Sequence, residues 1–123
     1  MLPRLYSRND VLALKRKRLV TEGSAKFTVT ITDLIAGAKK LYGFDTDSEI
    51  RKYLPLNYLR IQNKGGTILK VYVSQRSDGE VIQKDMIWTH HGDFYTFTLE
   101  NLDGSTTATG SQIYVDVQRN PGD

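Results

Sequence analysis

The chain contains no cysteine among its 123 residues. This absence excludes disulfides, thiol nucleophiles and thiolate metal sites, and it leaves the redox compartment open. Long apolar runs are also missing, since none approaches the roughly 20 residues that a membrane-spanning helix needs. The first ten residues, MLPRLYSRND, lack the apolar region of a secretory signal, which predicts a cytosolic product or an already processed chain.

Sequence motifs for catalysis are absent as well. The chain has no GxSxG, P-loop or HExxH motif and no dinucleotide-binding glycine pattern. No nucleophile stands in an evident pairing with a base. We therefore expect a protein that is not an enzyme, with no cofactor and no small-molecule substrate.

Two groups of residues resemble metal sites at first sight. His90 and His91 are adjacent, so in an extended segment their side chains leave opposite faces and cannot easily chelate one metal. Asp45, Asp47 and Glu49 take alternate positions, as in a calcium loop, but the glycine and the bidentate glutamate that such a loop requires later are missing. The sequence favours a solvated loop and predicts no metal site.

The positive charge is concentrated near the amino terminus. The length fits one domain, and the formal net charge is +3. Residues 1–22 hold six cations against two anions, a net charge of +4, whereas the remainder holds 11 cations against 12 anions. Four of the cations are consecutive: Lys15, Arg16, Lys17 and Arg18. An anionic partner should therefore meet this leader before it meets the rest of the chain.

The leader has the pattern of a short helix. Ser7 is a candidate N-cap, Asp10 follows in the first turn, and Gly23 ends the segment. Apolar residues recur between them at helical spacing: Val11, Leu12, Leu14 and Leu19. We expect a basic helix or arm over residues 1–23 that contacts a neighbouring protein, a genome or an anionic membrane leaflet through Lys15–Arg18. The alternative is a helix that docks on its own domain, with the four charges as its solvated side.

From Ser24 onwards the apolar period changes from that of a helix to that of strands. Turn sequences such as NKGG and NLDG separate the alternating runs. The pattern predicts a mainly β domain over residues 24–123, an antiparallel β-sandwich of six to eight strands, jelly-roll-like or Ig-like. Residues 33–55 fit helix, strand or loop. The predicted core comprises Phe27, Val29, Ile31, Leu59, Ile61, Leu69, Val71, Val73, Phe97, Leu99, Ile113, Val115 and Val117.

The solvent-facing positions of the predicted strands suggest two binding surfaces. Tyrosine beside arginine is typical of a protein interface, which indicates an assembly surface at Tyr58, Arg60, Tyr72 and Tyr114. The preference of tyrosine for strands is the simpler explanation. Trp88 and Tyr95 could form a platform on which a sugar stacks, although a Trp in the core or at its rim is the more common case.

About half of the chain resembles small β-sandwich structural proteins of double-stranded DNA viruses, those that form capsid decorations, pentons or spike bases. The matching pattern lies between Leu56 and Arg119: an IxNxG strand end, a VYV strand, an NL turn and a closing IxVxV strand. The residues in it are Ile61, Asn63, Gly65, Val71, Tyr72, Val73, Asn101, Leu102, Ile113, Val115 and Val117. The basic or extended amino-terminal arms of these proteins are similar in character to residues 1–22.

The resemblance implies a virion structural subunit. Its partners would be other copies of itself and other capsid proteins, with genome or membrane contact through the arm. The alternatives are a carbohydrate-binding or host-attachment module, and a nucleic-acid-binding domain driven by the leader.

Overall fold

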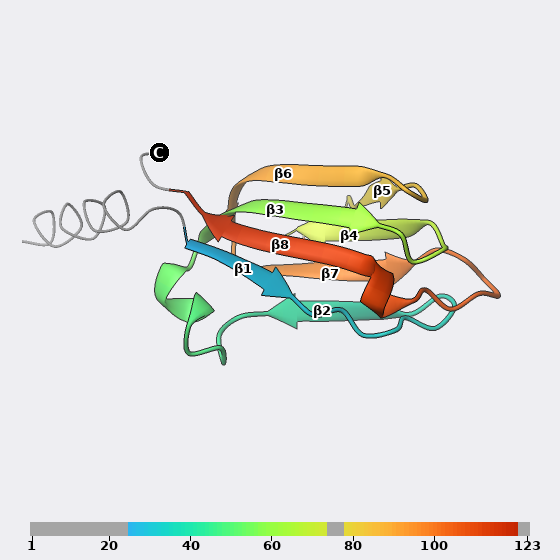
Figure 1. Cartoon of the computed structure of the whole chain (residues 1–123), viewed down its shortest axis with the longest axis horizontal. Helices are drawn as coiled ribbons and strands as arrows, with labels where there is room; N and C mark the ends of the chain where they lie inside the picture. Colours follow the sequence, from blue (N-terminus) through green and yellow to red (C-terminus); the bar gives the residue numbers. More distant parts are fainter. Residues whose placement is uncertain (1–24, 74–77, 121–123) are drawn as a thin grey trace, which may run out of the picture.

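Eight strands and two short 3₁₀ helices make up the computed structural model, which describes residues 25–73 and 78–120 (Figure 1). The strands are β1 (Ala25–Val29), β2 (Lys39–Gly43), β3 (Leu56–Asn63), β4 (Leu69–Val73), β5 (Glu80–Ile82), β6 (Ile87–Phe94), β7 (Thr96–Asn101) and β8 (Ile113–Arg119). The 3₁₀ helices are η1 (Ile50–Tyr53) and η2 (Gly110–Gln112). In this described part of the chain, no helix combines the length and the apolar character that crossing a membrane would take.

The strands form two antiparallel sheets of four strands each. Their orders are β1-β8-β3-β6 and β2-β7-β4-β5. The chain passes to the other sheet after each strand except β4, which is followed by its own neighbour β5. In Figure 1 the first sheet lies in front of the second, and β1 begins at the end of the molecule where β8 finishes. The prediction of a mainly β, antiparallel fold is therefore confirmed.

Side chains that alternate along the strands of both sheets meet in one apolar cluster. All predicted core residues are buried except Phe27 and Val29, which are half-buried against the cluster. The ring of Phe97 stacks on Tyr42 at 5.1 Å between centroids and lies 6.1 Å from Phe44. Further buried apolar residues come from the connections, from η1 and from strands β2, β3, β5 and β6: Leu34, Tyr42, Phe44, Ile50, Leu56, Ile82, Trp88, Phe94 and Ala108.

Residues 33–55 contain an edge strand and one helical turn. Gly37 turns the chain into β2 with a φ of +73°, a conformation that costs glycine little. The carboxylate of Asp47 then accepts the backbone amides of Glu49 at 2.9 Å and Ile50 at 3.0 Å, which caps the start of η1. Asp47 therefore acts as a local capping residue, and its neighbour Ile50 enters the core.

A fully buried asparagine, Asn63, ends β3. Its side-chain amide donates to the carbonyl of Thr67 at 2.8 Å and to that of Ile82 at 3.3 Å, so it ties the β3–β4 turn to β5. Its side-chain oxygen accepts the amide of Gly65 at 3.2 Å. Buried amides are tolerated where they are hydrogen-bonded in this way.

A second fully buried asparagine, Asn101, plays the same part at the end of β7. Its amide group donates to the carbonyls of Leu34 at 3.0 Å and Thr106 at 2.8 Å, and its oxygen accepts the amide of Asp103 at 3.0 Å. The two asparagines thereby organise the connections at the end of the molecule opposite the start of β1.

Replacing Phe97 with alanine should lower the free energy of unfolding by about 3–5 kcal/mol, because the substitution removes a fully buried ring and leaves a cavity. Leu41, which is 56% exposed on β2, provides the matched control, and Leu41→Ala should change stability by less than about 0.5 kcal/mol. Chemical denaturation measures both. Equal midpoints for the two variants would mean that the inward and outward faces are interchanged.

Candidate assembly surface

The four residues predicted to form an assembly surface lie on two different sheets. Tyr58 and Arg60 on β3 and Tyr114 on β8 point away from the core of the β1-β8-β3-β6 sheet. Tyr72 points outward from β4, which belongs to the other sheet. Because the chain crosses between sheets after β3, the apolar core separates Tyr72 from the other three. The prediction of one surface made of all four residues is therefore corrected to a three-residue set, with Tyr72 apart.

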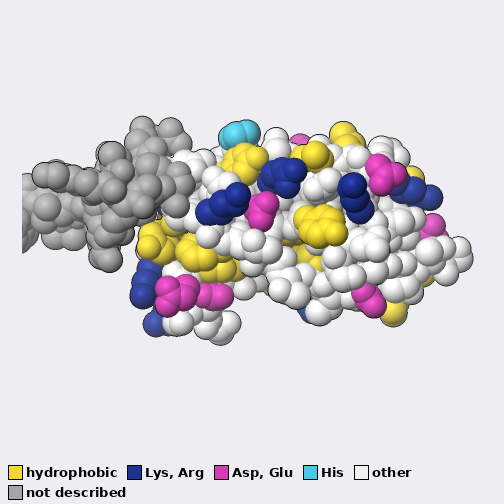
Figure 2. Space-filling view, viewed as in Figure 1, with side chains coloured by type: hydrophobic (Ala, Val, Ile, Leu, Met, Phe, Trp, Pro, Cys, Tyr) yellow, Lys and Arg dark blue, Asp and Glu magenta, His cyan; other side chains and the backbone are white. Residues whose placement is uncertain are grey.

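The outer side of the β1-β8-β3-β6 sheet, which we call the front face, carries rows of side chains that run across the strands. In Figure 2 basic, acidic and apolar side chains are interspersed over this face. The strand register gives three rows: Lys26, Gln118, Tyr58 and His91; Thr28, Asp116, Arg60 and Thr89; Tyr114, Gln62 and Ile87.

Asp116 occupies the middle of the front face. Its carboxylate accepts the hydroxyl of Thr28 at 3.3 Å and lies 3.6 Å from the guanidinium of Arg60. A partly exposed ion pair of this kind adds little to stability, so its charges remain available to a partner. Tyr114, beside this pair, is 49% exposed. The front face thus offers aromatic area next to arginine, as protein interfaces do.

Tyr72, on the opposite outer face, is engaged within its own sheet. Its hydroxyl donates to the carboxylate of Glu100 at 2.6 Å, and this hydrogen bond is the main reason that the pKa of Tyr72 lies above its ordinary value, with burial and the charge of Glu100 adding to it. The ammonium groups of Lys39 and Lys70 lie 4.9 Å and 5.4 Å from its ring centroid. A side chain at Gly79 would come within 2.7 Å of the ring. Tyr72 is thus a packed part of its sheet.

Trp88 and Tyr95 do not come together as a platform for a sugar. Trp88 faces the core, is 9% exposed and donates its indole N–H to the carboxylate of Glu80. Tyr95 is 55% exposed in the turn after β6, seven residues further along the chain. Because β6 belongs to the front sheet with Trp88 on its inner side, no ring face of Trp88 is presented to solvent. The interpretation of Trp88 as a core residue is the one that agrees with the structure.

The two histidines leave opposite faces of β6, as predicted. His90 faces inward, with its ring 6.1 Å from that of Trp88, and His91 faces outward, 5.0 Å from the ring of Tyr58. Within residues 25–73 and 78–120, no three or more histidine, aspartate or glutamate side chains lie close enough together to hold a metal ion.

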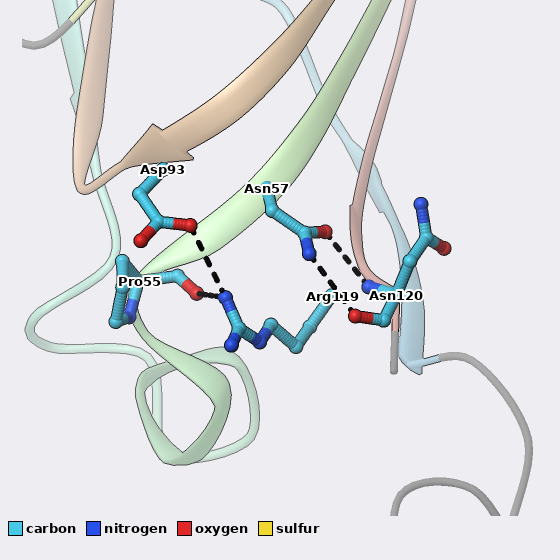
Figure 3. A network of polar contacts seen from close by, with 5 residues as sticks. All are labelled: Pro55, Asn57, Asp93, Arg119 and Asn120. Carbon is cyan, nitrogen blue, oxygen red and sulfur yellow. Dashed lines mark hydrogen bonds and ion pairs between the residues drawn. The ribbon is translucent and has the colours of Figure 1, made fainter. Parts of the chain in front are cut away.

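A polar network fixes the end of β8, where the chain also enters β1 (Figure 3). The side chain of Asn57 pairs with the backbone of Asn120 in both directions, donating at 3.0 Å and accepting at 2.8 Å. Arg119 donates to the carbonyl of Pro55 at 3.1 Å and lies 3.3 Å from the carboxylate of Asp93. These contacts hold the segment before β3, the end of β6 and the end of β8 in one place.

The predicted anion-contacting residues, Lys15, Arg16, Lys17 and Arg18, lie outside the described residues, and so does the predicted helix over residues 1–23. The first described residue, Ala25, pairs with Arg119 at the network of Figure 3. The described part of the chain therefore begins at this end of the front sheet.

At the opposite end, the connections enclose a shallow hollow of about 290 Å³. It is lined by Ile68, Lys84, Leu102, Asp103 and Gly104. The pKa of Asp103 lies below its usual value, chiefly because the backbone amides of Ser105 and Thr106 donate to its carboxylate. The carboxylate of Asp103 thus makes its hydrogen bonds within its own loop.

No protein-family model matches this chain, and no curated protein has a significantly similar sequence. The function proposed below therefore depends on the order of the strands, the front face and the charge of the leader.

Replacing Glu100 with glutamine should lower the pKa of Tyr72 toward 10.0, because it exchanges the carboxylate that accepts the phenol hydrogen bond for a weaker, neutral acceptor and also removes the negative charge. The raised pKa means that this contact stabilises the fold below pH 10 and that the contribution disappears as the pH rises through the folded-state pKa. NMR titration of labelled tyrosine, with Tyr72→Phe to assign the signal, measures the change. Asp116→Asn, on the front face, should leave the pKa of Tyr72 unaltered; an equal shift would show that general surface charge sets it.

Proposed function

We propose that this chain is a structural subunit of a virion, folded as a jelly-roll β-sandwich. The strand orders β1-β8-β3-β6 and β2-β7-β4-β5 carry the proposal. Two four-stranded sheets, between which the chain crosses after nearly every strand, are the jelly-roll arrangement. This arrangement recurs in viral capsid proteins as well as in lectin domains and cupins. The sequence resemblance to small virion proteins points to the first of these.

Copies of the subunit would associate through the front face. Arg60, Tyr58 and Tyr114 supply the residue types that are enriched at interfaces, and the face has both signs of charge at its centre. Mixed charges of this kind favour a contact in which opposite signs meet.

The leader would reach beyond the domain. Its net charge of +4 contrasts with the slightly negative remainder, so an anionic surface is its natural partner. A genome and an anionic membrane leaflet have that character, and an acidic patch on a neighbouring capsid protein would have it too. Binding to a genome is the one with a steep dependence on salt, because phosphate contacts release counterions.

Carbohydrate attachment has less support. Its aromatic platform would need Trp88, whose side chain is buried. A nucleic-acid-binding domain has support from the leader alone, because the rest of the chain carries 11 cations against 12 anions.

The mass of the native complex tests assembly most directly. Sedimentation and electron microscopy of the full chain should give a large complex with closed symmetry, alone or with its capsid partners. A monomer at every concentration, with and without virion components, would contradict the proposed function.

Replacing Tyr114 with glutamate should abolish assembly, because burying an unpaired carboxylate at the interface is strongly unfavourable. Tyr95→Glu is the matched control, since Tyr95 is as exposed as Tyr114 but lies in the turn after β6, away from the front face. Light scattering compares the two. Intact assembly of the Tyr114 variant, or equal loss in both, would remove the front face from the proposal.

Deleting residues 1–22 should preserve the β-sheet circular dichroism and most of the melting temperature, because the described residues contain their own core. The truncated protein should fail to enter the assembly. Replacing Lys15–Arg18 with four glutamines keeps the length of the leader and separates the role of charge from that of its apolar residues. Unfolding of the truncated chain would instead make the leader part of the core.

A further inference from the structure

The four edge strands of the two sheets differ in how well they are protected from pairing with another strand. On β2, the consecutive lysines Lys39 and Lys40 put one charge on each face of the edge, and β5 has three residues. On β6, the register shifts opposite Leu56 and Tyr58, and Gly92 has a φ of +139°. Charge, shortness and bulges are the features by which proteins block an edge.

The remaining edge, β1, has none of these features except one outward-facing charge. Its five residues pair with β8 without interruption, from Ala25 opposite Arg119 to Val29 opposite Val115. Among the backbone hydrogen bonds made outside the sheets by described residues, none involves β1. Its inward residues Phe27 and Val29 are half-buried against the core, with the ring of Phe27 5.7 Å from that of Tyr53, and no strand among the described residues pairs with the open side of β1.

We propose that β1 pairs antiparallel with β1 of a second copy, about a two-fold axis at Phe27. The front sheets of the two copies then form one continuous eight-stranded sheet, with the order β6-β3-β8-β1-β1-β8-β3-β6. A strand contact of this kind is self-complementary, as a two-fold interface must be. The inference adds a second contact, at the edge of the front sheet, to the self-assembly through the front face proposed above, and it rests on that function.

Charge complementarity selects the register. With Phe27 opposite Phe27 of the second copy, Lys26 lies opposite Thr28 of that copy. Within each copy, the hydroxyl of Thr28 donates to Asp116 on β8, the next strand. The long side chain of Lys26 from the other copy can therefore extend past the short side chain of Thr28 toward the carboxylate of Asp116. Asp116 then has a second cation beside Arg60, and the two-fold axis makes the contact twice.

Other registers lose this complementarity. A shift that puts Lys26 opposite Lys26 brings like charges together, which is destabilising in a cross-strand pair. A shift by a single position would place Lys26 opposite Phe27 and join the outer face of one sheet to the inner face of the other. The pairing at Phe27 also lets the two half-buried rings cover each other.

Disulfide formation between single-cysteine variants tests the register, since the natural chain has no cysteine. Lys26→Cys mixed with Thr28→Cys should give the mixed disulfide several times faster than either variant links to itself, because only residues 26 and 28 lie opposite each other. Both positions are exposed, so both variants should fold. Lys39→Cys mixed with Leu41→Cys, at the same spacing on the β2 edge, is the control and should not crosslink preferentially.

Lys26→Glu provides a second measurement, compared with Lys39→Glu on β2. The first should weaken association about tenfold, since it turns two attractive contacts into repulsive ones, and the second should leave association unchanged. Equal effects of the two variants, or a mixed disulfide no faster than in the β2 control, would overturn the β1 contact. If the native chain still assembles in that case, the proposed function survives without this contact; if the native chain never associates, both fail.

Discussion

The burial of alternate side chains in one shared cluster is the constraint on which the rest of the structure depends. Once Leu59 and Ile61 face the core from β3, the residues between them must face solvent, because side chains alternate along a strand. Shifting a strand by one residue would place Arg60 inside and expose its apolar neighbours. The composition of the front face is thus a direct consequence of core packing, and a substitution at an outward-facing position there leaves the core contacts in place.

The buried asparagine side chains lie near the ends of strands. Asn63 and Asn101 donate to carbonyl groups of the connections, and Asn57 donates to the backbone of Asn120 in the same way. Replacing such an asparagine with alanine leaves a buried polar group without its partner, so it should lower the free energy of unfolding by about 1–3 kcal/mol.

Much of the fold was predictable from the sequence, because period-two alternation reports burial directly. The inward residues of β3, β4, β7 and β8 and the separation of His90 from His91 follow from it. The assignment of strands to sheets does not follow, since alternation contains no information on which strands become neighbours. For this reason the sequence predicts one surface for Tyr58 and Tyr72, although they lie on different sheets. The buried state of Trp88 depends on how β6 packs against the other sheet, where Glu80 of β5 accepts its indole N–H, and Asn63 resembles an ordinary turn residue until its partners are known.

The pairing of Ala25 with Arg119 places the entrance of the first strand and the exit of the last at the same end of the sheet. The connections held by Asn63 and Asn101 lie at the far end, about the length of a strand away (Figure 1). A peptide or reporter fused directly before residue 25 or after residue 120 would therefore emerge from this end of the front sheet. A foreign loop inserted between Asp103 and Thr106 would instead be displayed from the opposite tip, so the two ends of the molecule can be labelled independently.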